Sequence, residues 1–157
     1  MTDAEIIEKL KGELGEDVLE VTNPSVRRIY IRIPSGRLVP AVTALRDRCG
    51  FRYLSTISGL DKGGTFEFIY HFADERVNLN LRTEIPRNDP HIASVSPVIP
   101  GAILYEREIQ EMFGVIVDNI PDPRPLLMPD GWPAGNYPLR KDWKYERPEE
   151  IIPGGKK

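Results

Sequence analysis

The chain has few of the residues that build a cofactor site, with one cysteine and two histidines among 157 residues. Because Cys49 is single, the sequence predicts no intrachain disulfide, iron–sulfur cluster or cysteine-bound zinc. His71 alternates with core positions of a predicted strand, and His91 follows a proline that starts a predicted helix. A structural or solvent-facing role is therefore favoured for both, and any redox centre is expected in another protein.

Targeting and membrane signals are also missing. The first residues, Met1–Glu5, lack the basic and apolar parts of a signal peptide. No window approaches the ~20 apolar residues that a membrane-spanning helix needs. We therefore expect a cytosolic and soluble chain, or one that associates with a membrane only through partner proteins.

Catalytic motifs are scarce as well. The sequence has no glycine-rich phosphate loop, no GxSxG elbow and no cysteine in a nucleophile context. Glu108 and Glu111 share one helix face and could pair for acid–base chemistry, but a solvated or ion-paired face is the commoner outcome. An independent enzyme would have to turn over substrate without any added subunit.

The charge balance disfavours nucleic acid as a partner. The net charge is −3 and the pI is near 5.5, whereas binding to a phosphate backbone needs clustered basic residues. The alternative of a free-standing RNA-binding module remains, with basic and aromatic residues on one sheet face: Arg27, Arg28, Tyr30, Arg32 and Arg52. Stacking aromatics are required for that function, and only Tyr30 is available on this face.

The first half of the chain alternates between helical and strand patterns. Asp3 is a candidate cap for a helix that contains Ile6 and Leu10 and that Gly15 would end. Strands are predicted over 17–21 and 26–33, where Ile29, Ile31 and Ile33 would face the core. Helical spacing then predicts a second helix through Leu38, Val42, Leu45 and Cys49.

Residues 51–84 change to a period of two and predict a three-stranded antiparallel meander, with a turn at Asp61-Lys62-Gly63-Gly64. A short helix is expected after Pro90, and a last helix over 101–113 with Gly114 as its C-terminal cap. These elements predict an α+β (α/β two-layer) fold, a mostly antiparallel sheet with helices on one side. An extended Pro-rich C-terminal tail would follow.

We predict a core domain over 1–114 and a partner-binding tail over 115–157. The tail holds eight of the fifteen prolines, so it can form neither a long helix nor a central strand. It also keeps Trp132 and Trp143, and large aromatics are rare in disordered linkers. Burial against a partner is favoured, and the alternative is a tail that folds back to cover its own sheet.

Two blocks are more specific than the rest of the chain: Glu106-Arg107-Glu108-Ile109-Gln110-Glu111-Met112-Phe113-Gly114 and Tyr137-Pro138-Leu139-Arg140-Lys141-Asp142-Trp143. With Arg124 and Leu126-Leu127 between them, they closely resemble the 30 kDa subunit family of respiratory complex I, also called the NADH-quinone oxidoreductase C-subunit family. The resemblance covers essentially the whole chain. Ile120, Pro123 and Pro125 depart from the respiratory pattern and resemble the counterparts in membrane-bound group 4 nickel–iron hydrogenases and related archaeal complexes.

The resemblance implies a subunit without cofactor or catalytic site in the hydrophilic arm of a complex I-like oxidoreductase that couples electron transfer to ion translocation. Such a complex would be an NADH-quinone oxidoreductase, an F420H2 dehydrogenase or a membrane-bound hydrogenase. Iron–sulfur clusters, and nickel–iron in the hydrogenase case, would belong to partner subunits. The complex would hold this chain peripherally on the cytoplasmic side of the cell membrane.

The partners implied are the large catalytic subunit, related to the hydrogenase large subunit, the small iron–sulfur subunit and a ferredoxin-like subunit. The residues that would contact them fall into charged groups and apolar anchors on the two blocks and the segment between. They are Glu106, Arg107, Glu108, Glu111, Phe113, Gly114, Asp122, Arg124, Leu126, Pro138, Leu139, Arg140, Lys141, Asp142 and Trp143.

Overall fold

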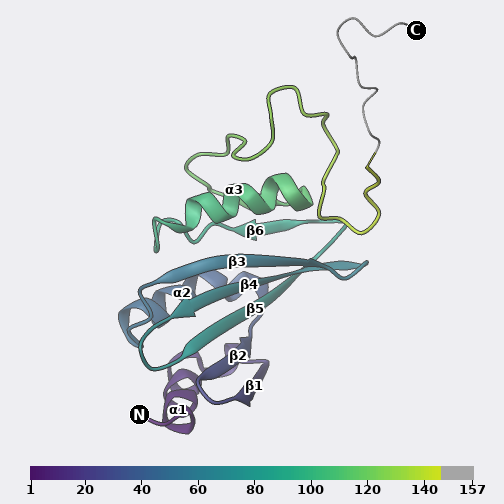
Figure 1. The fold of residues 1–157 in the computed structure, drawn as a ribbon. Helices are drawn as coiled ribbons and strands as arrows, with labels where there is room; N and C mark the ends of the chain where they lie inside the picture. Colours follow the sequence, from purple (N-terminus) through teal and green to yellow (C-terminus); the bar gives the residue numbers. More distant parts are fainter. Residues whose placement is uncertain (146–157) are drawn as a thin grey trace, which may run out of the picture.

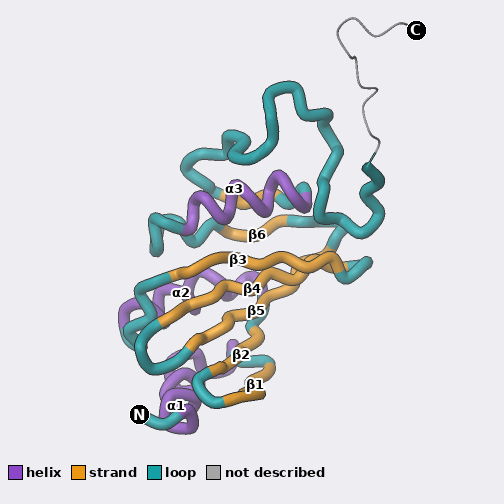
Figure 2. The backbone as a smooth tube through the Cα atoms, in the orientation of Figure 1, coloured by secondary structure: helices purple, strands orange, loops and turns teal. Residues whose placement is uncertain are grey.

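The structure is a computed structural model that describes residues 1–145. Five strands form one sheet in the order β1-β2-β5-β4-β3, and two short strands form a second. Figure 2 shows the strands and helices along the backbone. The elements are α1 (Asp3–Leu14), η1 (Gly15–Asp17), β1 (Glu20–Ser25), β2 (Arg28–Arg32), η2 (Ser35–Arg37), α2 (Leu38–Asp47), β3 (Leu54–Asp61), β4 (Thr65–Ala73), β5 (Asn78–Pro86), β6 (His91–Ala93), α3 (Ala102–Phe113) and β7 (Ile116–Asp118).

Helix α1 is capped one residue earlier than predicted, by Thr2 instead of Asp3. The Thr2 hydroxyl accepts from the Glu5 amide at 3.3 Å, and the Glu5 carboxylate accepts from the Thr2 amide at 2.6 Å, which is a capping box. The Asp3 carboxylate instead accepts from the Arg27 amide at 2.7 Å in the β1–β2 turn. Asp3 therefore fixes a distant turn rather than the start of its own helix.

The main sheet confirms the predicted meander and adds a parallel pair. Strands β3, β4 and β5 are antiparallel neighbours, and β2 pairs with β5 in parallel. Ile29, Ile31 and Ile33 are buried as predicted. Strand β1 begins at Glu20 rather than at residue 17, because Gly15–Asp17 forms a short 3-10 helix after α1.

The helices cover the apolar face of this sheet, which confirms the α+β class. Phe113 of α3 packs edge-on against Phe66 and Phe68 of β4, with ring centroids 5.8 Å apart in both pairs. Gly59 of β3 permits this approach, because a Cβ there would lie 2.4 Å from the Phe113 ring. Figure 1 shows α3 beyond the β3 edge of the sheet and α2 behind it.

The short helix predicted after Pro90 is wrong, because residues 91–93 form β6 in parallel with β7. The Ile116 amide donates to the Pro90 carbonyl at 2.8 Å, and Ile92 and Val117 are buried. This pairing joins segments far apart in sequence and overrides the local helix signal of a proline. The division predicted after Gly114 therefore cuts between α3 and a strand that completes the core.

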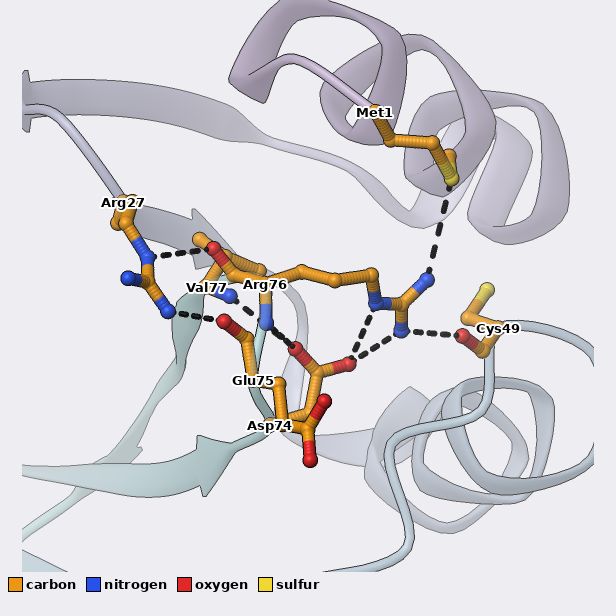
Figure 3. A network of polar contacts seen from close by, with 7 residues as sticks. All are labelled: Met1, Arg27, Cys49, Asp74, Glu75, Arg76 and Val77. Atoms are coloured by element: carbon orange, nitrogen blue, oxygen red, sulfur yellow. Dashed lines mark hydrogen bonds and ion pairs between the residues drawn. The ribbon is translucent and has the colours of Figure 1, made fainter.

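A polar network fastens the opposite end of the molecule (Figure 3). The Arg76 guanidinium pairs with Asp74 and donates to the Cys49 carbonyl at 3.1 Å. The Arg27 guanidinium donates to the backbone carbonyls of Glu75 and Arg76. The β4–β5 turn is thereby tied to the β1–β2 turn and to the loop before β3.

Candidate functional site

The segment from residue 119 to residue 145, called the strap below, arches over α3 (Figure 1). It contains only turns and extended backbone, as its prolines predict. It nevertheless exposes large apolar side chains, with exposed fractions of 57% for Leu127, 52% for Leu139 and 36% for Trp132. A segment without regular structure that presents such side chains needs other contacts to hold it in place.

Glu111 of α3 holds the first half of the strap. One carboxylate oxygen accepts from the amides of Leu126 at 2.6 Å and Met128 at 3.3 Å, and the other accepts from Leu127 at 2.8 Å. One side chain thus satisfies three consecutive backbone donors, and hydrogen bonds to an ionised acceptor are stronger than neutral ones. The backbone is turned toward the helix, and the Leu126 and Leu127 side chains stay exposed.

Arg107, one turn earlier on α3, holds the residues just before. Its guanidinium donates to the carbonyls of Arg124 at 2.7 Å and Pro125 at 2.8 Å. Arg124 itself is exposed and pairs with Asp122 at 2.7 Å, and these hydrogen bonds lower the pKa of the Asp122 carboxyl. Arg107 and Glu111 therefore use their charges on the strap of their own chain.

The second half of the strap closes over the end of α3. The Tyr137 ring lies against Gly114, where φ is 67° and a Cβ would lie 2.3 Å from the ring, so only glycine fits. The Arg140 guanidinium donates to the Phe113 carbonyl at 2.6 Å and stacks 4.4 Å from the Tyr137 centroid. Gly114 caps the helix as predicted and also seats the strap.

Asp61, at the end of β3, fastens the far end of the strap. Its carboxylate accepts from the Lys141 amide at 2.9 Å, from the Gly63 amide at 2.8 Å and from Arg87 at 2.6 Å. Arg87 also pairs with Asp142 at 2.8 Å. Burial alone would raise the pKa of Asp61, but these hydrogen bonds outweigh it and lower the pKa to about 2.

Asp61→Asn is expected to abolish a pH dependence of the strap contact. A carboxyl group with a lowered folded pKa stabilises the fold above its unfolded pKa, here 3.8, and this contribution is lost as the pH falls toward about 2. Urea unfolding at several pH values from about 5 to about 2 measures it. Asp130→Asn, at an exposed strap carboxylate, is the control and should keep the wild-type profile. Equal profiles for wild type and Asp61→Asn would contradict the assignment.

Glu106 lies inside the molecule rather than on a docking surface. Its side chain is fully buried and accepts from the Val95 amide at 2.6 Å and the Ser94 hydroxyl at 2.7 Å. Burial raises the pKa of this carboxyl against the opposing effect of those hydrogen bonds. The carboxylate of Glu106 is therefore not available to a partner.

The remaining predicted residues divide by exposure. Phe113 is buried in the core, Pro138 and Trp143 are half-buried, and Leu126 and Leu139 are exposed. Glu108 is half-buried and makes no ion pair or side-chain hydrogen bond within residues 1–145. The structure thus brings both predicted blocks together around the end of α3. It uses most of their charges within this chain. In the part described, Glu108 has no ion pair and the Leu126 and Leu139 side chains are exposed.

Sequence reasoning missed three residues of this surface: Asp61, Arg87 and Tyr145. Asp61 carried only a turn signal, and no local pattern links it to Lys141, eighty positions away. Tyr145 was detectable as a large aromatic residue in a Pro-rich segment, and its exposed fraction is 67%.

Both histidines, and two of the arginines named for RNA binding, are engaged in internal contacts. His71 bonds to Ser58 at 2.9 Å and Asn80 at 2.7 Å, and His91 bonds to Asp118 at 2.9 Å. Arg27 donates to backbone carbonyls, and Arg32 pairs with Glu20. Two of the arginines on which the RNA-binding alternative depends are therefore already paired with groups of their own chain.

Two kinds of feature are absent from residues 1–145. No group of three or more histidine, cysteine, aspartate or glutamate side chains is placed to hold a metal ion there. In the same range, no helix has both the length and the apolar character to cross a membrane.

Residues 31–149 match the family model described as the respiratory-chain NADH dehydrogenase, 30 kDa subunit. The C-subunit of the F420H2 dehydrogenase of Methanosarcina mazei is 35% identical over 143 residues, covering 88% of this chain and 90% of the relative. The C-subunit of the NADH-quinone oxidoreductase of Nocardioides sp. is 34% identical over 151 residues, covering 88% of this chain but 60% of that relative.

The fold has a counterpart among solved structures. A chain of the membrane-bound sulfane sulfur reductase, an archaeal respiratory membrane complex, superposes with a TM-score of 0.73, covering 90% of this chain and 85% of the other. At 23% identity, this likeness concerns the fold alone.

Proposed function

This chain belongs to the family of the 30 kDa subunit of respiratory-chain NADH dehydrogenase, and from that membership we propose that it is a non-catalytic structural subunit of a complex I-like oxidoreductase. Its relatives are subunits of complexes of this kind. In the proposal, the strap docks onto the large catalytic subunit and fixes its position relative to the small iron–sulfur subunit. Electron transfer and ion translocation are carried out by the other subunits.

The observation that supports docking most strongly is a backbone fixed from inside with apolar side chains outside. Glu111 and Arg107 hold the strap on α3, and Leu127, Leu139 and Trp132 remain exposed. A rigid surface loses less conformational entropy on binding than a flexible tail, and tryptophan is among the residues most frequent at interface hot spots. We therefore propose that the strap is a preorganised interface, held in its binding conformation before the partner arrives.

The proposal places all cofactors in partner subunits. The chain has one cysteine, Cys49, which is buried, whereas iron–sulfur clusters are typically held by several thiolates. Iron–sulfur clusters, and nickel–iron if the complex is a hydrogenase, would be held by the neighbours, among them a ferredoxin-like subunit. The complex would sit on the cytoplasmic side of the cell membrane, with this chain attached peripherally.

Leu127→Asp is expected to prevent assembly without unfolding the chain. Leu127 is 57% exposed, so the new carboxylate is solvated in the free chain and desolvated only at an interface. We expect at least about a 30-fold loss of co-purified iron–sulfur subunits, as for a hot-spot residue. Metal analysis and mass spectrometry of the complex captured through a tag on this chain measure the loss.

Leu19→Asp is the matched control. Leu19 is 54% exposed at the other end of the molecule, so the same substitution there should leave assembly unchanged. Wild-type yields of iron–sulfur subunits with Leu127→Asp would contradict docking through the strap.

A further inference from the structure

Strand β3 is the outermost strand of the main sheet on its α3 side. The Lys62 amide donates to the Thr65 carbonyl at 2.9 Å, which makes 62 and 65 a hydrogen-bonded pair. In an antiparallel ladder such pairs alternate, so Ser58 and Leu60 bond to β4 while the backbone groups of Ile57 and Gly59 point away from it. No turn, loop or strap residue of the described chain forms a backbone hydrogen bond with the amides of Ile57 and Gly59.

A groove of about 280 Å³ runs along this free edge. One wall is β3 from Thr56 to Gly59, and the other wall is the face of α3 with Ile109, Met112 and Phe113. Leu139 of the strap borders the groove and is 52% exposed. Backbone donors and acceptors therefore lie beside an apolar wall, which is the arrangement that an added β-strand uses.

Glu108 of α3 gives the groove a charge. It lines the same wall and has no cation paired with it among the residues described, whereas Arg107 and Glu111 beside it are both engaged by the strap. A half-buried carboxylate of this kind is complemented by a lysine or arginine on the occupant.

We propose that an extended segment of a partner subunit adds to β3 as a sixth strand and places a basic side chain against Glu108. The proposal rests on the proposed function, because it needs a partner subunit. A second copy of this chain fits less well, since a two-fold edge pairing would bring two Glu108 carboxylates into one interface.

Amide hydrogen exchange at single-residue resolution tests the strand register. In the isolated full chain, the Ile57 and Gly59 amides should exchange quickly, and those of Ser58 and Leu60 slowly. In the complex captured through this chain, Ile57 and Gly59 should slow by roughly 100-fold. If the complex forms and these two amides exchange as before, the added strand is wrong and the proposed function stands; if no complex forms, both are wrong. Protection that grows with the concentration of the isolated chain would assign the edge to a second copy and overturn the proposal.

Glu108→Lys tests the charge. We expect about a tenfold weaker association of the partner, with Glu108→Gln in between. Glu16→Lys has the same change in charge at an exposed position and should assemble as the wild type does. Association of Glu108→Lys at the wild-type level would overturn the basic partner residue.

Discussion

Replacing Glu106 with alanine is expected to lower the free energy of unfolding by about 3 kcal/mol, which is a large share of the stability of a small domain. The substitution leaves the Val95 amide and the Ser94 hydroxyl without their acceptor in a fully buried site, and it opens a cavity. Urea unfolding followed by circular dichroism measures the change.

Glu106→Gln is the matched variant. Its amide oxygen can still accept from Val95 and its amide nitrogen can donate to Ser94, so we expect a loss of only about 1 kcal/mol. Equal stability of the alanine and glutamine variants would contradict the role of Glu106 as the acceptor that holds the loop after β6.

The difference in stability between the wild type and Glu106→Gln should depend on pH, and the sign of this dependence follows from the pKa of Glu106. Burial raises the pKa of Glu106 above its ordinary value of 4.5, so the folded state takes up this proton more readily than the unfolded state. The resulting stabilisation is complete below 4.5 and is lost as the pH rises through the folded pKa. The stability of the wild type relative to Glu106→Gln should therefore fall as the pH rises from about 4 upward.

Glu111→Ala is expected to weaken assembly by up to about 100-fold while leaving the core folded. Three strap amides lose their common acceptor, and a loss of about 3 kcal/mol in holding the strap lowers the ratio of held to released strap by about two powers of ten. Because these hydrogen bonds hold the strap and not the core, the melting temperature should change little. Titration of the variant into complex lacking this subunit, with the bound fraction read by native mass spectrometry, measures the affinity.

Glu111→Gln keeps one acceptor oxygen and should lie between the alanine variant and the wild type. Glu16→Ala, at an exposed helix end, should assemble normally. Normal assembly of Glu111→Ala would mean that the partner orders the strap by itself, and that its position on α3 has no part in docking.

Much of the fold was predictable because its signals are local. The alternation of Ile29, Ile31 and Ile33 defines one strand, and Gly114 defines the end of α3 through its left-handed backbone. Strand β6 was not predictable, since three residues carry too little pattern and their structure comes from pairing with β7. The capping box at Thr2 has a sequence signature that the assignment of the cap to Asp3 overlooked.

The sequence was sufficient to predict which residues form the candidate site, but not which way their side chains face. Helical spacing put Glu106, Arg107, Glu108 and Glu111 on α3, but spacing does not say which of them faces the core, the strap or an open groove. The structure separates them: Glu106 holds an internal loop, Arg107 and Glu111 hold the strap, and Glu108 lines the groove beside β3. The tail folds back on α3 rather than over its own sheet face. Its prolines prevent regular secondary structure, and Arg107 and Glu111 of α3 form hydrogen bonds with its backbone groups instead.

Hydroxyl-radical footprinting of this chain, alone and within the captured complex, tests the docking surface most directly. Trp132 and Tyr145 lie on the strap and Tyr53 precedes β3, with exposed fractions of 36%, 67% and 65%, so all three should be oxidised in the isolated chain. In the complex, we expect strong protection of Trp132 and Tyr145 and no change at Tyr53. Oxidation of Trp132 and Tyr145 at the same rate in the complex as in the isolated chain would contradict the claim that the strap is the docking surface.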